Sequence, residues 1–291
     1  MIFLIGSIIL SSYLTLSFKV LERMGINTFQ SIVCNYITCV ITGSIVNGGS
    51  PFNYSVVHNN WFPWAIAMGC LFIGLFNLIA ITAQRSGVSV ASVANKLSLV
   101  IPFIFSVVFY KEEAGILKLV GIIMALLAVL WVSQRTNVTG ATKTMTISLP
   151  LLPLLLFLGS GMLDTLIKYV EDRFLNGSNN NDFLVTAFAA AAVIGLLFLL
   201  LEVLRGKQTI SGKAVLAGIA IGIPNYFSIW CLVNLLKHYA GNSSAIIPVN
   251  NMGIVALSTV VAALFFQEKL SRKNWLGIIL SIAAIALIAF G

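Results

Sequence analysis

The sequence repeats one long apolar stretch, and this repeat decides the fold. Residues 93–123 are VANKLSLVIPFIFSVVFYKEEAGILKLVGII, and residues 249–279 are VNNMGIVALSTVVAALFFQEKLSRKNWLGII. A shift of 156 positions aligns the two stretches without a gap, and it places Asn95 on Asn251 and Glu112 on Glu268. Each copy predicts an apolar helix, a short charged turn and a second apolar helix. An internal repeat of this kind indicates a chain made of two related halves.

The composition excludes a water-soluble globular protein. Of the 291 residues, 59% are hydrophobic and only 9% are charged, whereas a soluble domain carries about 25% charged residues. Apolar runs of about 20 residues recur along the chain, and each is long enough to cross the core of a bilayer. Only a helix satisfies its own backbone hydrogen bonds in lipid. The sequence therefore predicts an all-α polytopic membrane protein, whose first apolar run is a spanning helix and not a removed signal peptide.

Ten transmembrane helices are predicted, connected mostly by short loops. They cover residues 2–21, 28–46, 61–83, 88–109, 116–133, 147–169, 183–204, 213–236, 243–266 and 275–290. The polar linker 134–146 separates a first five-helix half, residues 1–133, from a second, residues 147–291. Five is an odd number, so the second half enters the membrane in the opposite direction. The prediction is two inverted five-helix repeats around a pseudo-two-fold axis in the membrane plane, as in many secondary transporters.

The basic residues lie mainly in loops and predict topology. The net charge of +8 is explained by the orientation of the helices and by anionic lipid, and not by nucleic acid. Eleven lysines and arginines fall on the side of the first turn and five on the opposite side. The excess of positive charge in cytoplasmic loops would then place both termini outside the cytoplasm.

The most informative single residue is Lys96. It lies about eight residues into the fourth span, roughly 12 Å deep, where a charge is costly and is by default a functional candidate. The alternative is that its ammonium group reaches the interface or a loop. Its neighbour Asn95 matches Asn251 in the repeat, and Asn250 adds a second amide beside Pro248. These asparagines are expected either to line a cavity or to form hydrogen bonds between helices.

Further candidates are weaker. Asn77 and Asn225 match each other at a shift of 148 positions, and Trp230 and Asn234 follow in the same helix as Asn225. All four are predicted to line a polar cavity, with helix packing as the alternative.

Asp164 is the one carboxylate well inside an apolar run, and Lys168 follows one helical turn later. The two side chains share a helix face and could simply pair. A carboxylate in a low dielectric could instead carry a proton.

Other chemistries lack a sequence pattern. There is no phosphate-binding G-x-x-x-x-G-K-[ST] motif, and His58 and His238 are in loops without metal-ligand spacing. The four cysteines all lie in apolar helices and are expected to be buried free thiols. The sequence therefore predicts no enzyme, no metal site and no cofactor.

Taken together, these features resemble the drug/metabolite transporter superfamily, EamA type. The resemblance rests on the ten spans, the Glu112 and Glu268 turns, the Val120–Ile123 and Leu276–Ile279 segments that follow them, and a lysine near the end of the first helix of each half, Lys19 and Lys168. It implies a central cavity open to one side at a time, with both termini in the cytoplasm, in conflict with the loop charges. It also implies a kink at Pro102.

The predicted function is a multi-pass transporter of the cell membrane. It would export or exchange small organic solutes such as amino acids, metabolites or drugs by alternating access, with its two halves rocking around a midplane cavity. Lys96 and the asparagines would bind solute, Lys19, Lys168 and Asp164 would lie at its mouths, and a proton is a candidate coupling ion. A lipid-modifying membrane enzyme and a channel are the alternatives. Monomer and homodimer both remain open, as does the substrate.

Overall fold

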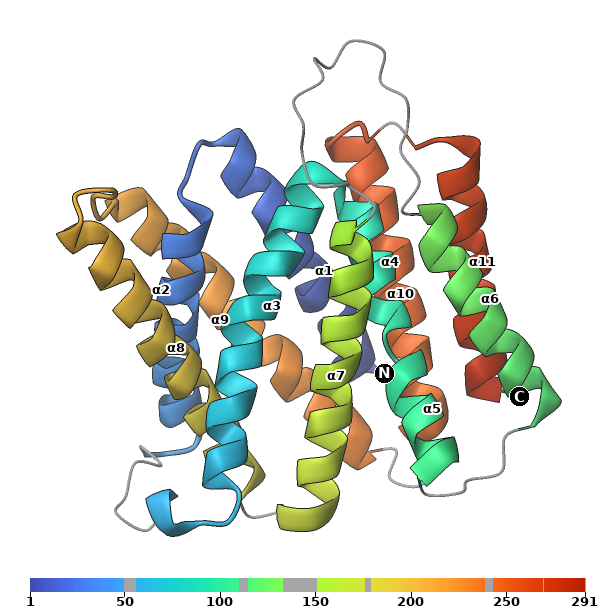
Figure 1. The fold of residues 1–291 in the computed structure, drawn as a ribbon, viewed down its shortest axis with the longest axis horizontal. Helices are drawn as coiled ribbons and strands as arrows, with labels where there is room; N and C mark the ends of the chain where they lie inside the picture. The colour runs from blue at the N-terminus through green and yellow to red at the C-terminus, as the bar shows by residue number, and fades with distance from the viewer. Residues whose placement is uncertain are drawn as a thin grey trace.

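The computed structural model describes residues 1–49, 56–109, 115–132, 151–175, 179–238, 243–268 and 270–290. The secondary structure in these ranges is helical, without a strand (Figure 1). The helices are α1 (Ile2–Arg23), α2 (Thr28–Val46), α3 (Phe62–Arg85), α4 (Val88–Leu97), α5 (Val100–Phe109), α6 (Ile116–Val132), α7 (Leu151–Phe174), α8 (Asn180–Leu204), α9 (Gly212–His238), α10 (Ser243–Phe265) and α11 (Arg272–Phe290), with a 3-10 turn η1 (Val56–His58).

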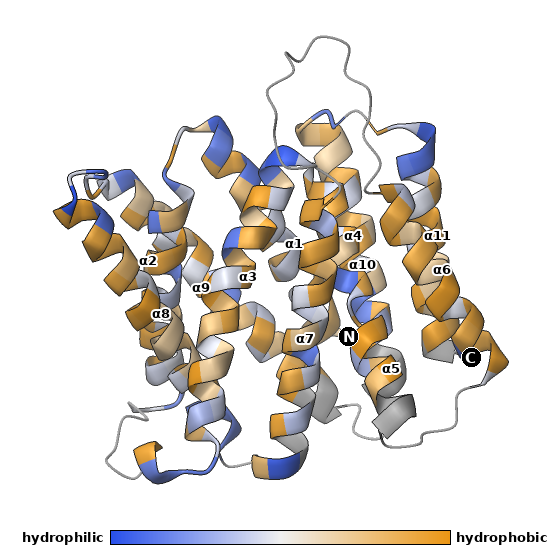
Figure 2. Cartoon of the chain, in the orientation of Figure 1, coloured by the Kyte–Doolittle hydropathy of each residue, from blue (hydrophilic) through white to orange (hydrophobic). Residues whose placement is uncertain are grey.

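These helices confirm the predicted polytopic fold. Each α-helix corresponds to one predicted span, except that α4 and α5 follow each other along the fourth span. Seven spans in the described ranges are long and apolar enough to cross a membrane. Figure 2 shows hydrophobic colour over most of each helix and hydrophilic colour concentrated at the helix ends. The chain is therefore a multi-pass membrane protein. The predicted linker 134–146 and the turn around Glu112 lie outside the described residues.

The fourth span is broken in two, where one helix with a kink was expected. Pro102 has no amide hydrogen, so it cannot donate to the carbonyl of Ser98 one turn earlier. The amide of Ile101 donates to that carbonyl instead, at 2.9 Å, and tightens the chain into a short turn. Residues 98 and 99 consequently separate α4 from α5.

Two expectations about the ends and faces of helices are wrong. The predicted loop 171–182 is helical up to Phe174, because Tyr169 and Phe174 pack against the ring of Trp64 on α3. Cys70 is exposed on the outside of α3, whereas the four thiols were expected to be buried. An apolar helix that faces lipid tolerates a thiol on that side as readily as in the core.

The two halves of the chain are interleaved. α2 packs on α9 and α3 packs on α8, so each pair takes one helix from each half. Both contacts are close because small residues meet there: a Cβ on Gly69 would lie 2.8 Å from the carbonyl oxygen of Ala187. One on Gly222 would lie 2.7 Å from that of Asn35. Figure 1 shows α2, α8 and α9 together at one side of the molecule.

Helices α6 and α11 occupy equivalent positions in the two copies of the repeat, and they contact each other. A Cβ on Gly121 would lie 3.0 Å from the carbonyl oxygen of Ala284, and one on Gly277 would lie 3.1 Å from that of Ala128. The shift of 156 residues converts each contact into the other. The start of each helix lies beside the end of its partner, so the two are antiparallel. This reciprocal contact supports the predicted inversion of the two halves, which stays a prediction.

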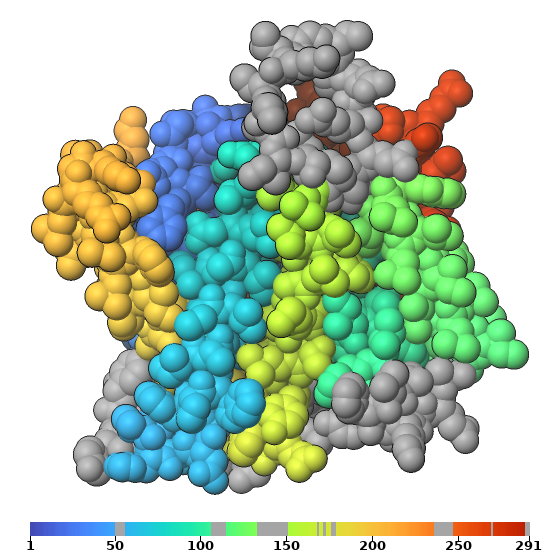
Figure 3. Space-filling view, in the orientation of Figure 1, coloured from blue at the N-terminus to red at the C-terminus, as the bar shows by residue number. Residues whose placement is uncertain are grey.

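The short helix α4 occupies the centre of the molecule. Its ten residues pack against six other helices: α1, α3, α6, α7, α10 and α11. A helix at the surface of the bundle would contact fewer neighbours. In the space-filling view of Figure 3, α7 lies on the visible face between α3 and α6, with little of the α4 region visible behind it. The break between α4 and α5 therefore lies inside the bundle.

Candidate solute-binding site

The break between α4 and α5 presents a hydroxyl group to α7. The Ser98 Oγ lies 2.6 Å from the carbonyl oxygen of Asn95 and 3.1 Å from the carboxylate of Asp164. A serine has one hydroxyl proton, so these two acceptors share it. The break thus creates a polar junction between α4 and α7 in an otherwise apolar region. Ser98 was not among the predicted site residues.

Asp164 lies on the side of α7 that faces the α4–α5 break. Its side chain is exposed. Met162, two residues earlier, is 62% exposed on the outward row that also includes Leu158. Two residues turn a helix by about 200°, so Asp164 points away from this outward row. Asp164 is therefore exposed on the side of α7 that faces Ser98, where the predicted cavity would lie.

Lys96 supplies the opposite charge at this cavity. It lies in the last turn of α4, is half-buried, and is close enough to Asp164 for the two charges to interact. The two described side chains form no direct ion pair. A cation and an anion therefore lie near each other inside the bundle without a direct contact between them.

Asn250 and Asn251 are buried on α10, which packs against α4. The side-chain oxygen Oδ1 of Asn250 has no hydrogen-bond partner among the described residues, and neither has the buried hydroxyl of Ser92 on α4. Buried polar atoms in native proteins are almost always paired. Unsatisfied groups on two packed helices, α4 and α10, are consistent with a site whose partner is a guest molecule or water.

The other predicted site residues are not brought to this cavity by the described contacts. Asn225 donates a 3.1 Å hydrogen bond to Asn35 on α2, so it joins two helices. Asn77 and Asn234 bond to carbonyl groups of their own helices, at 2.7 and 2.8 Å. Trp230 makes edge-to-face contacts with rings on α1 and α9. These contacts are ones that the packing alternative would also give, and the place of these four residues in a cavity stays a prediction.

Glu268, another residue outside the predicted site, connects the end of α10 to the start of α4 at one end of the bundle. Its carboxylate accepts hydrogen bonds from the backbone amides of Val88, at 2.5 Å, and Ser89, at 3.3 Å, and from the Ser89 hydroxyl, at 3.0 Å. A carboxylate at a helix start accepts hydrogen bonds from free amide donors, and its negative charge interacts favourably with the positive end of the helix dipole. A sequence signal existed, because α4 starts after Gly87 without a capping side chain of its own.

Lys19 and Arg23 lie at the same end. Arg23 donates to the carbonyl oxygens of Phe265 and Phe266 on the α10 side, at 3.3 and 2.9 Å. Lys19 pairs with Glu22 at 2.7 Å and donates to the carbonyl of a residue near the end of α3. The contacts of Arg23 and Glu268 both join the two halves of the chain. The side chain of Lys168, predicted at the opposite mouth, lies outside the described residues.

A membrane-embedded helix bundle with a broken central helix and opposite charges beside the break has the architecture of a membrane transporter. The comparisons with known proteins agree. Residues 1–134 match the model of the EamA-like transporter family. The first half of the chain is therefore an EamA-like unit, and the resemblance to the drug/metabolite transporter superfamily is confirmed on these residues.

Two whole-chain similarities extend the comparison. A Haemophilus influenzae protein described as uncharacterized is 26% identical over 286 residues, which cover 97% of this chain and 95% of the relative. A crystal structure of a protein with 16% sequence identity has a TM-score of 0.62 and covers 98% of this chain and 94% of that one. At that identity the crystal structure shows a shared fold alone. Both similarities span the two halves.

Proposed function

We propose that this protein is a secondary transporter that exports or exchanges small charged organic solutes across the cell membrane by alternating access. The observation that carries the proposal is that Lys96 and Asp164, opposite charges on α4 and α7 beside the α4–α5 break, interact without a direct ion pair. The coarser statement, a membrane transporter of small solutes, is what the EamA-like match suggests.

The charges at the cavity define the kind of solute that fits it. The ammonium group of Lys96 would bind a carboxylate or phosphate of the solute, since charge-assisted hydrogen bonds are the stronger ones. Asp164 would bind an ammonium group of the solute or carry the coupling proton. The amides of Asn95, Asn250 and Asn251 would fix its orientation. Amino acids and other small metabolites carry such groups.

The contacts at one end of the bundle support alternating access. Glu268 and Arg23 hold helices from both halves together there. A carrier must break the contacts that close one end when it opens that end, and re-form them as the other end opens. These inter-half hydrogen bonds are suited to that role because each can exchange its partner for water.

Transport in proteoliposomes tests the proposal. Vesicles loaded with unlabelled amino acids, organic acids or phosphate esters would be offered the same labelled solute outside. For a carrier, at least one solute is expected to enter preloaded vesicles faster than empty ones. The internal solute carries the binding site back to the outside, so the carrier does not have to return empty. Flux that is not increased by preloading and reaches channel rates would contradict it, as would consumption of vesicle lipid without any solute flux.

A further inference from the structure

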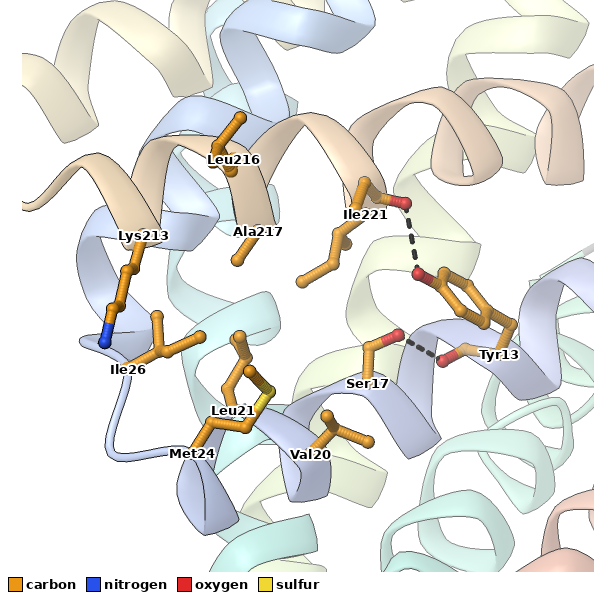
Figure 4. Close-up of a pocket in the computed structure, with 11 residues that line it drawn as sticks. Tyr13, Ser17, Val20, Leu21, Met24, Ile26, Lys213, Leu216, Ala217 and Ile221 are labelled. Carbon is orange, nitrogen blue, oxygen red and sulfur yellow. Dashed lines mark hydrogen bonds between the residues drawn. The ribbon is translucent and has the colours of Figure 1, made fainter.

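A second cavity lies outside the site described above, on the lateral face between α1 and α9. It has a volume of about 490 Å³ and is open to the outside of the bundle (Figure 4). It forms because small side chains face each other, with Ser17 on α1 and Ala217 and Ala220 on α9. The walls are the apolar side chains of Val20, Leu21, Met24, Ile26, Leu216 and Ile221.

The length of this groove matches one leaflet of a bilayer. It extends along α1 from Tyr13 to Met24, about 16 Å at 1.5 Å per residue. The hydrocarbon core of a bilayer is about 30 Å thick, so the groove reaches from one membrane surface to about the midplane. Its inner end is closed where the Tyr13 hydroxyl donates to the carbonyl of Ala220 at 3.2 Å.

The outer end of the groove has a single cation at its mouth. Lys213, in the first turn of α9, is exposed and lines the groove opposite Tyr13, as Figure 4 shows. The loop before α9 adds Arg205 and Lys207, both exposed, on the same membrane surface. Gln30 of α2 holds this loop through hydrogen bonds to Gln208 and to Thr209. The surface beside the groove is therefore positively charged.

From the apolar length and the charged mouth, we propose that this groove binds one anionic phospholipid. One acyl chain would lie between α1 and α9 as far as Tyr13, and the phosphate would bind the ammonium group of Lys213. The occupant comes from the bilayer itself, because the groove is open laterally along the helices. Since α1 belongs to the first half of the chain and α9 to the second, the lipid would contact both.

Native mass spectrometry of the purified full-length protein tests this site. The protein would be released from nanodiscs of equal phosphatidylglycerol and phosphatidylcholine with identical acyl chains. The wild type is expected to retain one phosphatidylglycerol in preference to phosphatidylcholine. Lys213→Gln is expected to lower phosphatidylglycerol retention about fivefold, the effect of one base near a membrane surface.

Two controls separate this site from general lipid adhesion. Lys273→Gln is the matched control, because Lys273 is also an exposed second residue of a helix, α11, but lies outside the groove. It should leave retention unchanged. Ala217→Trp should exclude both lipids by filling the groove. If Ala217→Trp does not fold, Ser17→Leu fills the groove from α1 and serves the same purpose.

Other results would overturn the proposal. Equal retention of the two lipids by the wild type would remove the charge selectivity. Equal loss in Lys213→Gln and Lys273→Gln would assign the effect to the membrane surface as a whole. A dimer that carries no lipid and dissociates on Ala217→Trp would assign the groove to a second copy of the chain.

Discussion

A charge inside a bilayer is costly, and this chain places two of opposite sign beside one helix break. Lys96 and Asp164 come from α4 and α7, and Ser98 at the helix break contacts the carboxylate. Intramembrane charges that face an interior space mark pathways for solutes and protons. The same two groups would cost less if they formed a direct ion pair, and the proposed solute would supply the contacts that they lack.

Replacing Lys96 should remove the anion contact of the solute. Lys96→Met keeps the length and packing of the side chain but deletes its charge. Charged hydrogen bonds contribute about 1.5–3 kcal/mol, so the half-saturating solute concentration is expected to rise at least about tenfold. The measurement is initial uptake rate in proteoliposomes. Lys118→Met, in the first turn of α6, is the control, and unchanged transport of every solute by Lys96→Met would contradict the assigned role.

Asp164 is expected to matter for coupling. Asp164→Asn still accepts the Ser98 hydrogen bond but cannot take up a proton at any pH used in transport assays. Accumulation driven by a pH gradient should therefore be lost, whereas exchange of labelled for unlabelled solute without a gradient should continue. Asp182→Asn, in the first turn of α8, serves as the control. Gradient-driven accumulation that survives Asp164→Asn would exclude a proton on this carboxylate.

The site could be predicted from the sequence only in part. Lys96, Asn95 and Asp164 were identifiable because a polar residue inside an apolar run is visible without coordinates. The contact of Asp164 with Ser98 was not, since Ser98 reaches the carboxylate from another helix, whereas the spacing pointed to Lys168 on the same helix, whose side chain lies outside the described residues. Asn77 and Asn225 have hydrogen bonds within a helix or between packed helices, and their place in a cavity stays a prediction.

At the scale of helices, the division of the fourth span into α4 and α5 depends on a single missing amide hydrogen. Pro102→Ala would restore a donor for the Ser98 carbonyl and allow one continuous helix. The expected result is a midpoint of thermal unfolding raised by about 2–4 °C, the effect of about 1 kcal/mol in a chain of this order of size, together with slower transport.

Pro153→Ala is the matched control for this variant. Pro153 lies in the first described turn of α7, where a missing amide hydrogen interrupts little. Thermal unfolding and uptake would be measured on both proteins. If Pro102→Ala transported solute at the wild-type rate, the break itself would have no part in the cycle.

The start of α4 depends on a side chain from the far end of the sequence. Glu268→Gln removes the charge that caps α4 while keeping nearly the same shape. A helix cap contributes about 1 kcal/mol, so hydrogen exchange of the amides of residues 88–91 should become about fivefold faster. Glu22→Gln is the control, because its partner Lys19 is on the same helix. Unchanged exchange in Glu268→Gln would show that the Glu268 carboxylate does not stabilise this end of α4.

The order of the helices was predictable, and their exact continuity was not. α2 starts and ends at the residues that hydrophobicity predicted, because polar residues flank it on both sides. α7 runs past its predicted end to Phe174, since packing against Trp64 outweighs the polar sequence there. Hydrophobicity measures the preference for lipid, and it does not record contacts between helices distant in the chain.

At the scale of the whole molecule, the reciprocal contact of α6 with α11 allows a symmetry test. Gly121→Leu and Gly277→Leu should each destabilise the protein by overpacking, about 1–3 kcal/mol, and by similar amounts. Gly74→Leu is the control, because a Cβ there would meet nothing within 4 Å. Thermal unfolding of the purified proteins provides the comparison. If only one of Gly121→Leu and Gly277→Leu destabilised the protein, the result would argue against the two-fold relation.

The close contacts of Gly69 with α8 and of Gly222 with α2 have a mechanical meaning. Backbones that approach without intervening side chains cannot slide past each other without steric collision. Both seams join helices from different halves of the sequence. The rigid bodies that move during transport are therefore expected to contain helices from both halves of the sequence. The sequence alone predicted that each half would move as one body. Hinges would then fall at the short turns such as residues 98 and 99, where the polypeptide already lacks helical continuity.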